Sequence, residues 1–209
     1  MLDTAVAIAD SDGTEGVTLR AVAARARVPL LRVQREVGSR DRLVAAMVQR
    51  VLAARTMGEA QDPVPGSVLR RLGLDEWTAY RRHPWLVPVL ASTRPPLVPA
   101  VLAAARSAVE AFRSLGLGAE VSRDRYVSFS AYIQGMGLLL VAEQQETRRS
   151  FASLEGWWDG EVRRLDRTGV ARRHPWLTEL SDAPARALDL DAAFRDGLDR
   201  VVRGLTALD

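Results

Sequence analysis

The chain has 209 residues, 47% hydrophobic and 26% charged, which is enough for one or two domains with a buried core. It contains no cysteine, so disulfide bonds and thiolate metal sites are excluded, and it contains no run of about 18 apolar residues that would cross a membrane. With no charged and apolar leader at its start, it is expected to be a soluble cytoplasmic protein.

Positive charge is concentrated at the N-terminal end of the chain. Residues 1–55 contain nine arginines and six acidic residues, a net charge of +3, whereas residues 56–209 contain twenty of each and are neutral. All 29 basic residues are arginine, a bias that GC-rich codons also produce. A local excess of positive charge is typical of a module that binds nucleic acid.

The first quarter of the chain predicts four short helices. Thr18 is the expected N-cap of the second helix, and Pro29 suits the opening turn of the third, where an N–H has no partner in any case. Gly38 ends the third helix, and Ser39 can cap the fourth. The expected helices run up to Asp10–Gly13 and over residues 18–26, 29–37 and about 40–57.

A segment rich in proline and glycine, QDPVPGS at Gln61–Ser67, interrupts this pattern. We place the domain boundary there, which divides the chain into residues 1–58 and 59–209. Apolar residues then recur at helical spacing, and strand-like alternation is scarce. The predicted fold class is therefore all-α, a short N-terminal module followed by a larger helical bundle with helices at about 67–82, 84–92, 97–115, 120–147, 151–166 and 191–207.

The second and third predicted helices have the size and spacing of a helix-turn-helix, although a plain three-helix cluster with a polar surface has the same spacing. In this motif the second helix enters the major groove. There arginine reads guanine, glutamine reads adenine, and an aliphatic group contacts the thymine methyl. Residues at the starts of flanking helices contact phosphates. The candidate DNA-contacting residues are Thr18, Arg20, Leu30, Leu31, Arg32, Gln34, Arg35 and Arg40.

The hexapeptide RRHPWL occurs twice, at Arg81–Leu86 and Arg172–Leu177, and contains both histidines of the chain. The likeness does not extend to either side, so it does not indicate a structural repeat. In each copy the proline is expected to end one helix and begin the next, with the tryptophan anchoring the corner. We therefore expect no metal site and no cofactor.

The stretch ADSDGTEGVTLRAVAARARVPLLRVQREVGSRDRLVAAMV, Ala9–Val48, resembles the N-terminal domain of TetR-family transcriptional regulators. Two further segments, Ala91–Leu117 and Phe194–Leu208, are similar to tetracycline-repressor-like regulators. The resemblance implies a homodimer that binds a double-stranded DNA operator and a small-molecule inducer or co-repressor, most simply as a repressor, with no membrane partner. The residues that carry it in the first segment are Ala9, Asp10, Gly13, Thr18, Arg20, Val22, Ala23, Val28, Val37, Ser39 and Leu43.

Several residues depart from the pattern of the resembled family. The family usually has glycine at the turn where this chain has Arg27, and an aromatic residue and a histidine where it has Gln34 and Glu36. Gln34 would lose packing on the DNA backbone, and Glu36 would add negative charge near phosphates. The first helix is also short, with no basic arm before it. These departures leave the strength of operator binding open.

Apolar cavities between helices are where small ligands bind in such bundles, so aromatic and polar residues of the body are candidates for a pocket. In tetracycline repressors a histidine just before the TRP segment binds the metal of the drug, and the matching residue here is Leu90. A metal–drug chelate is therefore not the expected ligand, and an apolar or aromatic compound fits better. The candidate pocket residues are Trp77, Tyr80, Leu90, Thr93, Arg94, Phe112, Phe129, Gln134 and Trp157.

Two features of the body predict the surface of a dimer. Glycine inside a helix costs about 1 kcal/mol relative to alanine, and a close helix crossing would justify Gly135 and Gly137. The last helix carries an apolar stripe at i, i+4, i+7, i+8 and i+11. The resemblance implies that these two helices form a four-helix interface, although a core within one subunit has the same pattern. The stripe consists of Phe194, Leu198, Val201, Val202 and Leu205.

Three functions compete at this point. The first is a ligand-responsive DNA-binding regulator. The second is a dimeric helical interaction protein of the same fold with weak or lost operator binding. The third, a small all-α enzyme, is disfavoured because the sequence has no cysteine nucleophile, no glycine-rich phosphate loop and no helical metal-binding spacing of His and Glu.

Overall fold

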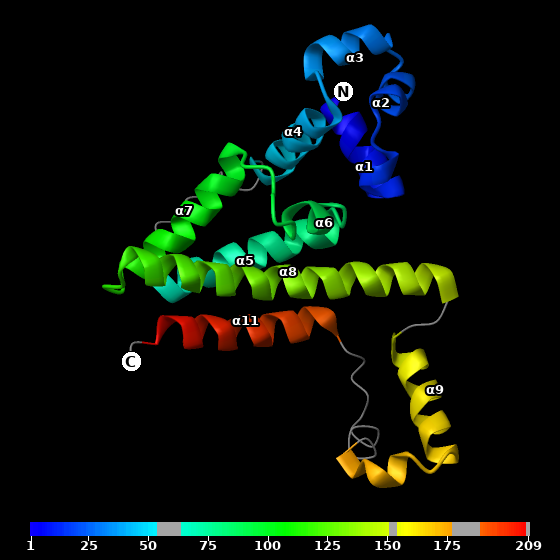
Figure 1. The fold of residues 1–209 in the computed structure, drawn as a ribbon, viewed down its shortest axis with the longest axis vertical. Helices are drawn as coiled ribbons and strands as arrows, with labels where there is room; N and C mark the ends of the chain where they lie inside the picture. Colours follow the sequence, from blue (N-terminus) through cyan, green and yellow to red (C-terminus); the bar gives the residue numbers. More distant parts are fainter. Residues whose placement is uncertain (54–63, 151–153, 177–188, 208–209) are drawn as a thin grey trace.

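The computed structural model describes residues 1–53, 64–150, 154–176 and 189–207, and in these ranges every regular element is helical. Figure 1 shows a small N-terminal module at one end of a larger bundle, from which one helical segment projects. The elements are α1 (Leu2–Gly16), α2 (Leu19–Ala26), α3 (Leu30–Val37), α4 (Arg40–Ala53), α5 (Pro65–Arg82), α6 (Leu86–Leu90), α7 (Pro99–Arg113), α8 (Ala119–Ser150), α9 (Leu154–Arg167), the short 3-10 helix η1 (Ala171–Arg173) and α11 (Leu190–Thr206).

The predicted helices are confirmed, with most ends shifted by a few residues. The largest difference is in α1, which continues beyond Asp10 to Gly16 across a kink at Gly13, whose φ of 72° suits glycine. Thr18 caps α2 as expected, because its Oγ1 accepts a 3.0 Å hydrogen bond from the Ala21 N–H. The expected end of the fourth helix at Met57 and the proposed boundary at 58/59 lie outside the described residues.

The N-terminal module has its own apolar core. Val22 of α2 and Val33 of α3 are fully buried, as are Leu43 and Met47 of α4. These residues come from three helices at helical spacing, so each helix presents one apolar face to the others. The expected interior of a helix-turn-helix is thus present.

The body is a bundle in which α5 and α8 contact each other and both contact α7 and α11. Its largest fully buried side chains are Tyr80 and Phe112. At Gly137 a Cβ atom would lie 2.8 Å from the Tyr80 ring, so this glycine permits a close approach inside the subunit. None of the helices in the described ranges is long and apolar enough to cross a membrane.

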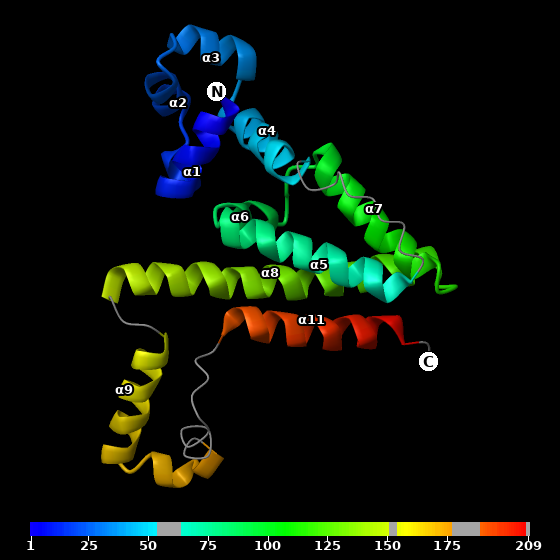
Figure 2. The same cartoon turned by 180° about the vertical axis from the view of Figure 1, so that it is seen from behind.

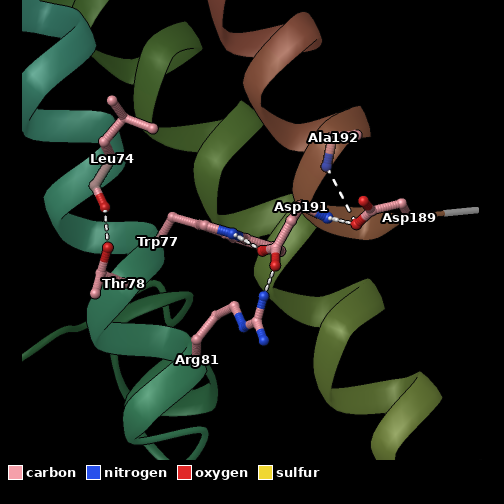
Figure 3. Close-up of polar contacts among 7 residues, drawn as sticks. All are labelled: Leu74, Trp77, Thr78, Arg81, Asp189, Asp191 and Ala192. Carbon is pink, nitrogen blue, oxygen red and sulfur yellow. Dashed lines mark hydrogen bonds and ion pairs between the residues drawn. The ribbon is translucent and has the colours of Figure 1, made fainter.

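Helix α11 is fastened to α5 by an acidic residue at its start. Figure 3 shows Asp191 between two side chains of α5: the Trp77 indole N–H donates to it at 2.6 Å, and Arg81 forms an ion pair with it. Asp189 caps α11 by accepting from the N–H groups of its first turn. The Trp77 and Phe194 rings stack with their centroids 4.3 Å apart. The stacked rings of Trp77 and Phe194 therefore pack α11 against α5.

In the described part of the chain, side chains of Asp10 and Gln49 make polar contacts that join the module to the body. Oδ1 of Asp10 in α1 accepts a 2.9 Å hydrogen bond from the Trp85 indole N–H. The same oxygen lies 2.8 Å from His83 Nδ1. On α4, Gln49 Oε1 accepts a 2.9 Å hydrogen bond from the N–H of Ala100, in the first turn of α7. The position of α2 and α3 relative to the bundle is therefore linked to α6 and α7.

The two RRHPWL segments have different surroundings. In the first, Trp85 is buried at the corner before α6, as predicted. In the second, Trp176 is 53% exposed, so the prediction that it anchors a corner is wrong within the described residues. The described residues of this second segment begin within η1 and lie in the part of the chain that projects from the bundle with α9 in both views (Figures 1 and 2).

Candidate DNA-binding face and ligand cavity

Helices α2 and α3 meet through a tight turn at Arg27. This residue is left-handed, with φ 55° and ψ 44°, and the next N–H, that of Val28, bonds the Ala23 carbonyl at 3.0 Å. The turn reverses the chain so that Val22 and Val33 face each other inside. Within the described ranges, Arg27 is the only residue other than glycine with a positive φ. A residue with a Cβ atom is strained in this conformation.

The outward face of α3 is open to solvent and lies at the outer end of the molecule (Figure 1). Leu31 is 66% exposed on this face, while Leu30 is half-buried and contacts the core. The side chains that a major groove would meet are therefore an aliphatic group, an amide and two guanidinium groups. The exposed predicted residues of α3 are Leu31, Arg32, Gln34 and Arg35.

Glu36 does not add an isolated negative charge to this face. Its Oε1 lies 2.8 Å from Arg32 Nε, an ion pair one helical turn apart. The bond to Glu36 raises the pKa of the Arg32 guanidinium and occupies Nε, which leaves its terminal nitrogens for other acceptors. The pair is exposed at the surface, and the effect of Glu36 on phosphate binding stays a prediction.

The two flanking arginines have different environments. Arg20 is exposed at the start of α2, where the dipole of the helix also favours an anion. Arg40 instead donates hydrogen bonds to the backbone carbonyls of Val17 at 3.0 Å and Thr14 at 2.6 Å. Its guanidinium therefore satisfies carbonyls at the end of α1. The Arg40 side chain is also 42% exposed, and its contact with phosphate stays a prediction.

The body contains a cavity of about 230 Å³ between α5, α7 and α8. Leu52 of α4 and Leu90 of α6 also line it, so the cavity touches the N-terminal module directly. The remaining lining residues are Arg71, Leu72, Asp75 and Glu76 from α5, Pro95 before α7, Ala100, Val101, Ala103, Ala104, Ala105, Ser107 and Ala108 from α7, and Tyr126, Phe129, Ser130 and Gln134 from α8.

Of the nine predicted pocket residues, Leu90, Phe129 and Gln134 line this cavity. Trp77, Tyr80 and Phe112 are buried in the core and do not line it, because they pack between the helices of the bundle. Thr93 and Arg94 are exposed in the segment after α6. Trp157 is 54% exposed on α9. These six residues lie outside this cavity, and a contact between any of them and a ligand stays a prediction.

The ionic residues of the cavity come from α5, and none of them is among the predicted pocket residues. Arg71 and Asp75 form a loose ion pair, with 3.7 Å between Nη1 and Oδ2. Tyr80 donates a hydrogen bond to Glu76. Burial raises the pKa of the Glu76 carboxyl, which favours its neutral form, and burial also raises the pKa of Tyr80, which keeps its phenol protonated.

The predicted dimer surface needs revision. Phe194, Leu198 and Val202 are buried against α5 and α8 within the subunit, and Gly137 packs on Tyr80. These four residues are therefore core residues. Val201 and Leu205 are half-buried, and Gly135 is exposed with open space beside it.

A different apolar row is exposed on α8, which lies beside α11 in both views (Figures 1 and 2). Its members recur at i, i+4, i+8, i+11, i+12 and i+15, which places them along one side of the helix. An exposed apolar row of this kind is typical of a surface that another protein covers. The row consists of Val127, Ala131, Gly135, Leu138, Leu139 and Ala142.

Comparisons with known proteins agree with this architecture. Residues 67–208 match the family model described as tetracyclin repressor-like, C-terminal domain. Over 209 residues, all of this chain and 76% of the relative, the chain is 27% identical to the HTH-type transcriptional repressor DrrR1 of Streptomyces coeruleorubidus.

Two solved structures from Streptomyces coelicolor share the fold. The transcriptional regulator SCO7222, a TetR, superposes with a TM-score of 0.77 at 23% identity, over 99% of this chain and 96% of that one. The TetR family protein ActR in complex with actinorhodin superposes with a TM-score of 0.75 at 22% identity, over 98% and 93%.

Proposed function

Because this chain belongs to the tetracycline repressor-like family of transcriptional regulators, we propose that it is a homodimeric repressor controlled by a small molecule. In this proposal α3 enters the major groove of an operator, and the cavity of the body binds the ligand. Such a protein acts on DNA in the cytoplasm and catalyses no reaction.

The observation that carries the DNA-binding part is the exposed face of α3 in the positively charged quarter of the chain. Arg32, Gln34 and Arg35 are exposed there on a short helix whose other side is fixed by the buried Val33. A rigid helix with arginine and glutamine on its open face is suited to base edges. The relative DrrR1 is itself named a transcriptional repressor, which supports this assignment.

The exposed row on α8 supports the dimer. A two-fold axis would bury the same row on both subunits, and an axis directed toward the N-terminal module would place both copies of α3 on the same side of the assembly. Two half-sites would then lie about 34–36 Å apart, one turn of DNA, or a multiple of that spacing.

The position of the cavity supports control by a ligand. Leu52 of α4 and Leu90 of α6 both line it, and Ala100 of its α7 wall is bonded to Gln49 of α4. A ligand that moves any of these helices acts on the module that carries α3. ActR, a structural neighbour, has been solved in complex with actinorhodin, a precedent for a small molecule bound to this fold.

The alternative, an interaction protein that has lost operator binding, rested on Gln34 and Glu36. The ion pair between Glu36 and Arg32 offsets the charge of Glu36 on the same helix, and the family match together with the repressor relative favours the regulator.

Footprinting on DNA upstream of its own gene, combined with a salt titration, tests the proposal. We expect protection of two half-sites and a binding constant that falls steeply with salt, by about 0.9 log units per log unit of salt for each phosphate contacted. Equal binding to a scrambled duplex at every salt concentration would contradict it.

A further inference from the structure

Arg71 has donor capacity that its surroundings leave unused. It lines the cavity, and within the described part of the chain its buried Nε has no hydrogen-bond partner. Its Nη1 is 3.7 Å from Asp75, which is too long for a hydrogen bond. The neighbouring Arg70 differs, since its Nε donates to Asp199 at 2.7 Å. A guanidinium carries five N–H donors and no acceptor, so Arg71 calls for an oxygen acceptor.

The two carboxyl groups of the cavity do not offer an equivalent site for a cation. The Asp75 side chain is 47% exposed, so water can satisfy its carboxylate, and Glu76 accepts a hydrogen bond from the Tyr80 hydroxyl. Burial raises the pKa of Glu76, so its neutral form is favoured where a ligand would meet it. The unused polar capacity of the cavity is therefore of the donor type.

The other residues that line the cavity favour a ligand whose main part is apolar and small. The α7 wall is mostly alanine, including Ala100, Ala104 and Ala108, and Phe129 of α8 faces the same space. An apolar cavity of roughly 150 Å³ is enough for one benzene ring. The 230 Å³ present here therefore has room for about two fused rings. Ser130 and Gln134 provide polar groups at the edge.

From these contacts we infer that the cavity binds an aromatic acid of about two fused rings, whose single carboxylate or phenolate oxygen group is held by Arg71. The inference depends on the proposed function, which makes the cavity a ligand site, and adds the chemistry of the ligand. Hydrogen bonds from an ionised donor to an ionised acceptor are about twice as strong as neutral ones, which makes the acid group the main determinant of selectivity.

Three probes with the same ring system test this: the anion 2-naphthoate, the neutral 2-naphthamide and the cation 2-naphthylmethylammonium. Calorimetric titration of the full chain should rank naphthoate about tenfold tighter than the amide, with the cation weakest. Arg71→Met should abolish the preference for naphthoate. Arg70→Met is the matched control, because it removes the same charge one residue away and should keep the preference.

The order of the three probe affinities in the wild-type protein tests the inference even if Arg71→Met fails to fold. An amide or cation that binds as tightly as naphthoate, or no binding of any probe at millimolar concentration, would overturn the ligand class. An unchanged preference in folded Arg71→Met would overturn the role of Arg71. Failure of the proposed function is seen separately, as absence of specific DNA binding by the wild type without any probe.

Discussion

The indole N–H of Trp85 donates a 2.9 Å hydrogen bond to Oδ1 of Asp10, and this bond joins α6 of the body to α1 of the DNA-binding module. Trp85 is buried, and it immediately precedes the helix that carries Leu90 to the cavity. His83 contacts the same oxygen of Asp10. The corner after α5 therefore connects the cavity with the first helix of the module.

Asp10→Ala should destabilise the protein by about 1–3 kcal/mol, because it leaves the buried indole N–H of Trp85 without an acceptor. Asp12→Ala, on the exposed side of the same helix, is the control and should stay within about 0.5 kcal/mol of wild type. Urea unfolding measures both. Equal stabilities of the two variants would show that the contact between module and body contributes nothing.

Arg27→Gly should raise the free energy of unfolding by about 0.5–1 kcal/mol. Arg27 has φ 55°, which costs energy for a residue with a Cβ atom but not for glycine. The matched control is Arg25→Gly, inside α2, which should lower stability by about 1 kcal/mol. Thermal unfolding of the two variants gives the sign of each effect, and a destabilised Arg27→Gly would contradict the assigned strain.

Arg40→Ala should lower the stability of the N-terminal module by about 1–2 kcal/mol, because its guanidinium donates to the carbonyls of Thr14 and Val17. Arg42→Ala removes an exposed arginine two residues further on and should change stability by less than about 0.5 kcal/mol. Circular dichroism melts compare them. If Arg40→Ala had the melting temperature of wild type and lost only DNA affinity, Arg40 would contact phosphate, as the sequence predicts, and would not stabilise the module.

Leu138→Glu should dissociate the dimer, since it places an unpaired charge in the centre of the exposed row on α8. Leu102→Glu on α7 is matched to it, because both leucines are 49% exposed in the subunit. Sedimentation at micromolar concentration should find Leu102→Glu dimeric and Leu138→Glu monomeric. A dimeric Leu138→Glu would move the interface to another surface.

The sequence was sufficient to predict the helices because their signals are local. Apolar spacing near 3.6, the cap at Thr18 and the proline at the start of α3 each act within one helix turn. The core of the module was predictable for the same reason, since Val22 and Val33 belong to adjacent helices. The kink at Gly13 was not, because a glycine near a helix end can also stop it.

Functional assignments failed where they depend on a neighbour far along the chain. The stripe of Phe194, Leu198 and Val202 shows that one face of α11 is covered, but not that α5 and α8 of the same subunit cover it. The sequence alone does not distinguish an arginine that donates to the carbonyls at the end of α1, as Arg40 does, from one that only contacts phosphate. Arg71 and Asp75 have the spacing of a solvated ion pair, and only the packing of α5, α7 and α8 places them at a cavity.

The central claim is that α3 reads DNA, and a gel-shift comparison of Arg35→Ala with Arg113→Ala tests it most directly. Both variants lose one exposed arginine, but Arg113 is the last residue of α7, in the body rather than in the module. Arg35→Ala should weaken binding to the footprinted operator by about 1–3 kcal/mol and bind scrambled DNA almost as before, whereas Arg113→Ala should match wild type on both. If Arg35→Ala retained the full preference for the operator, or if both variants lost it equally, recognition by α3 would be contradicted.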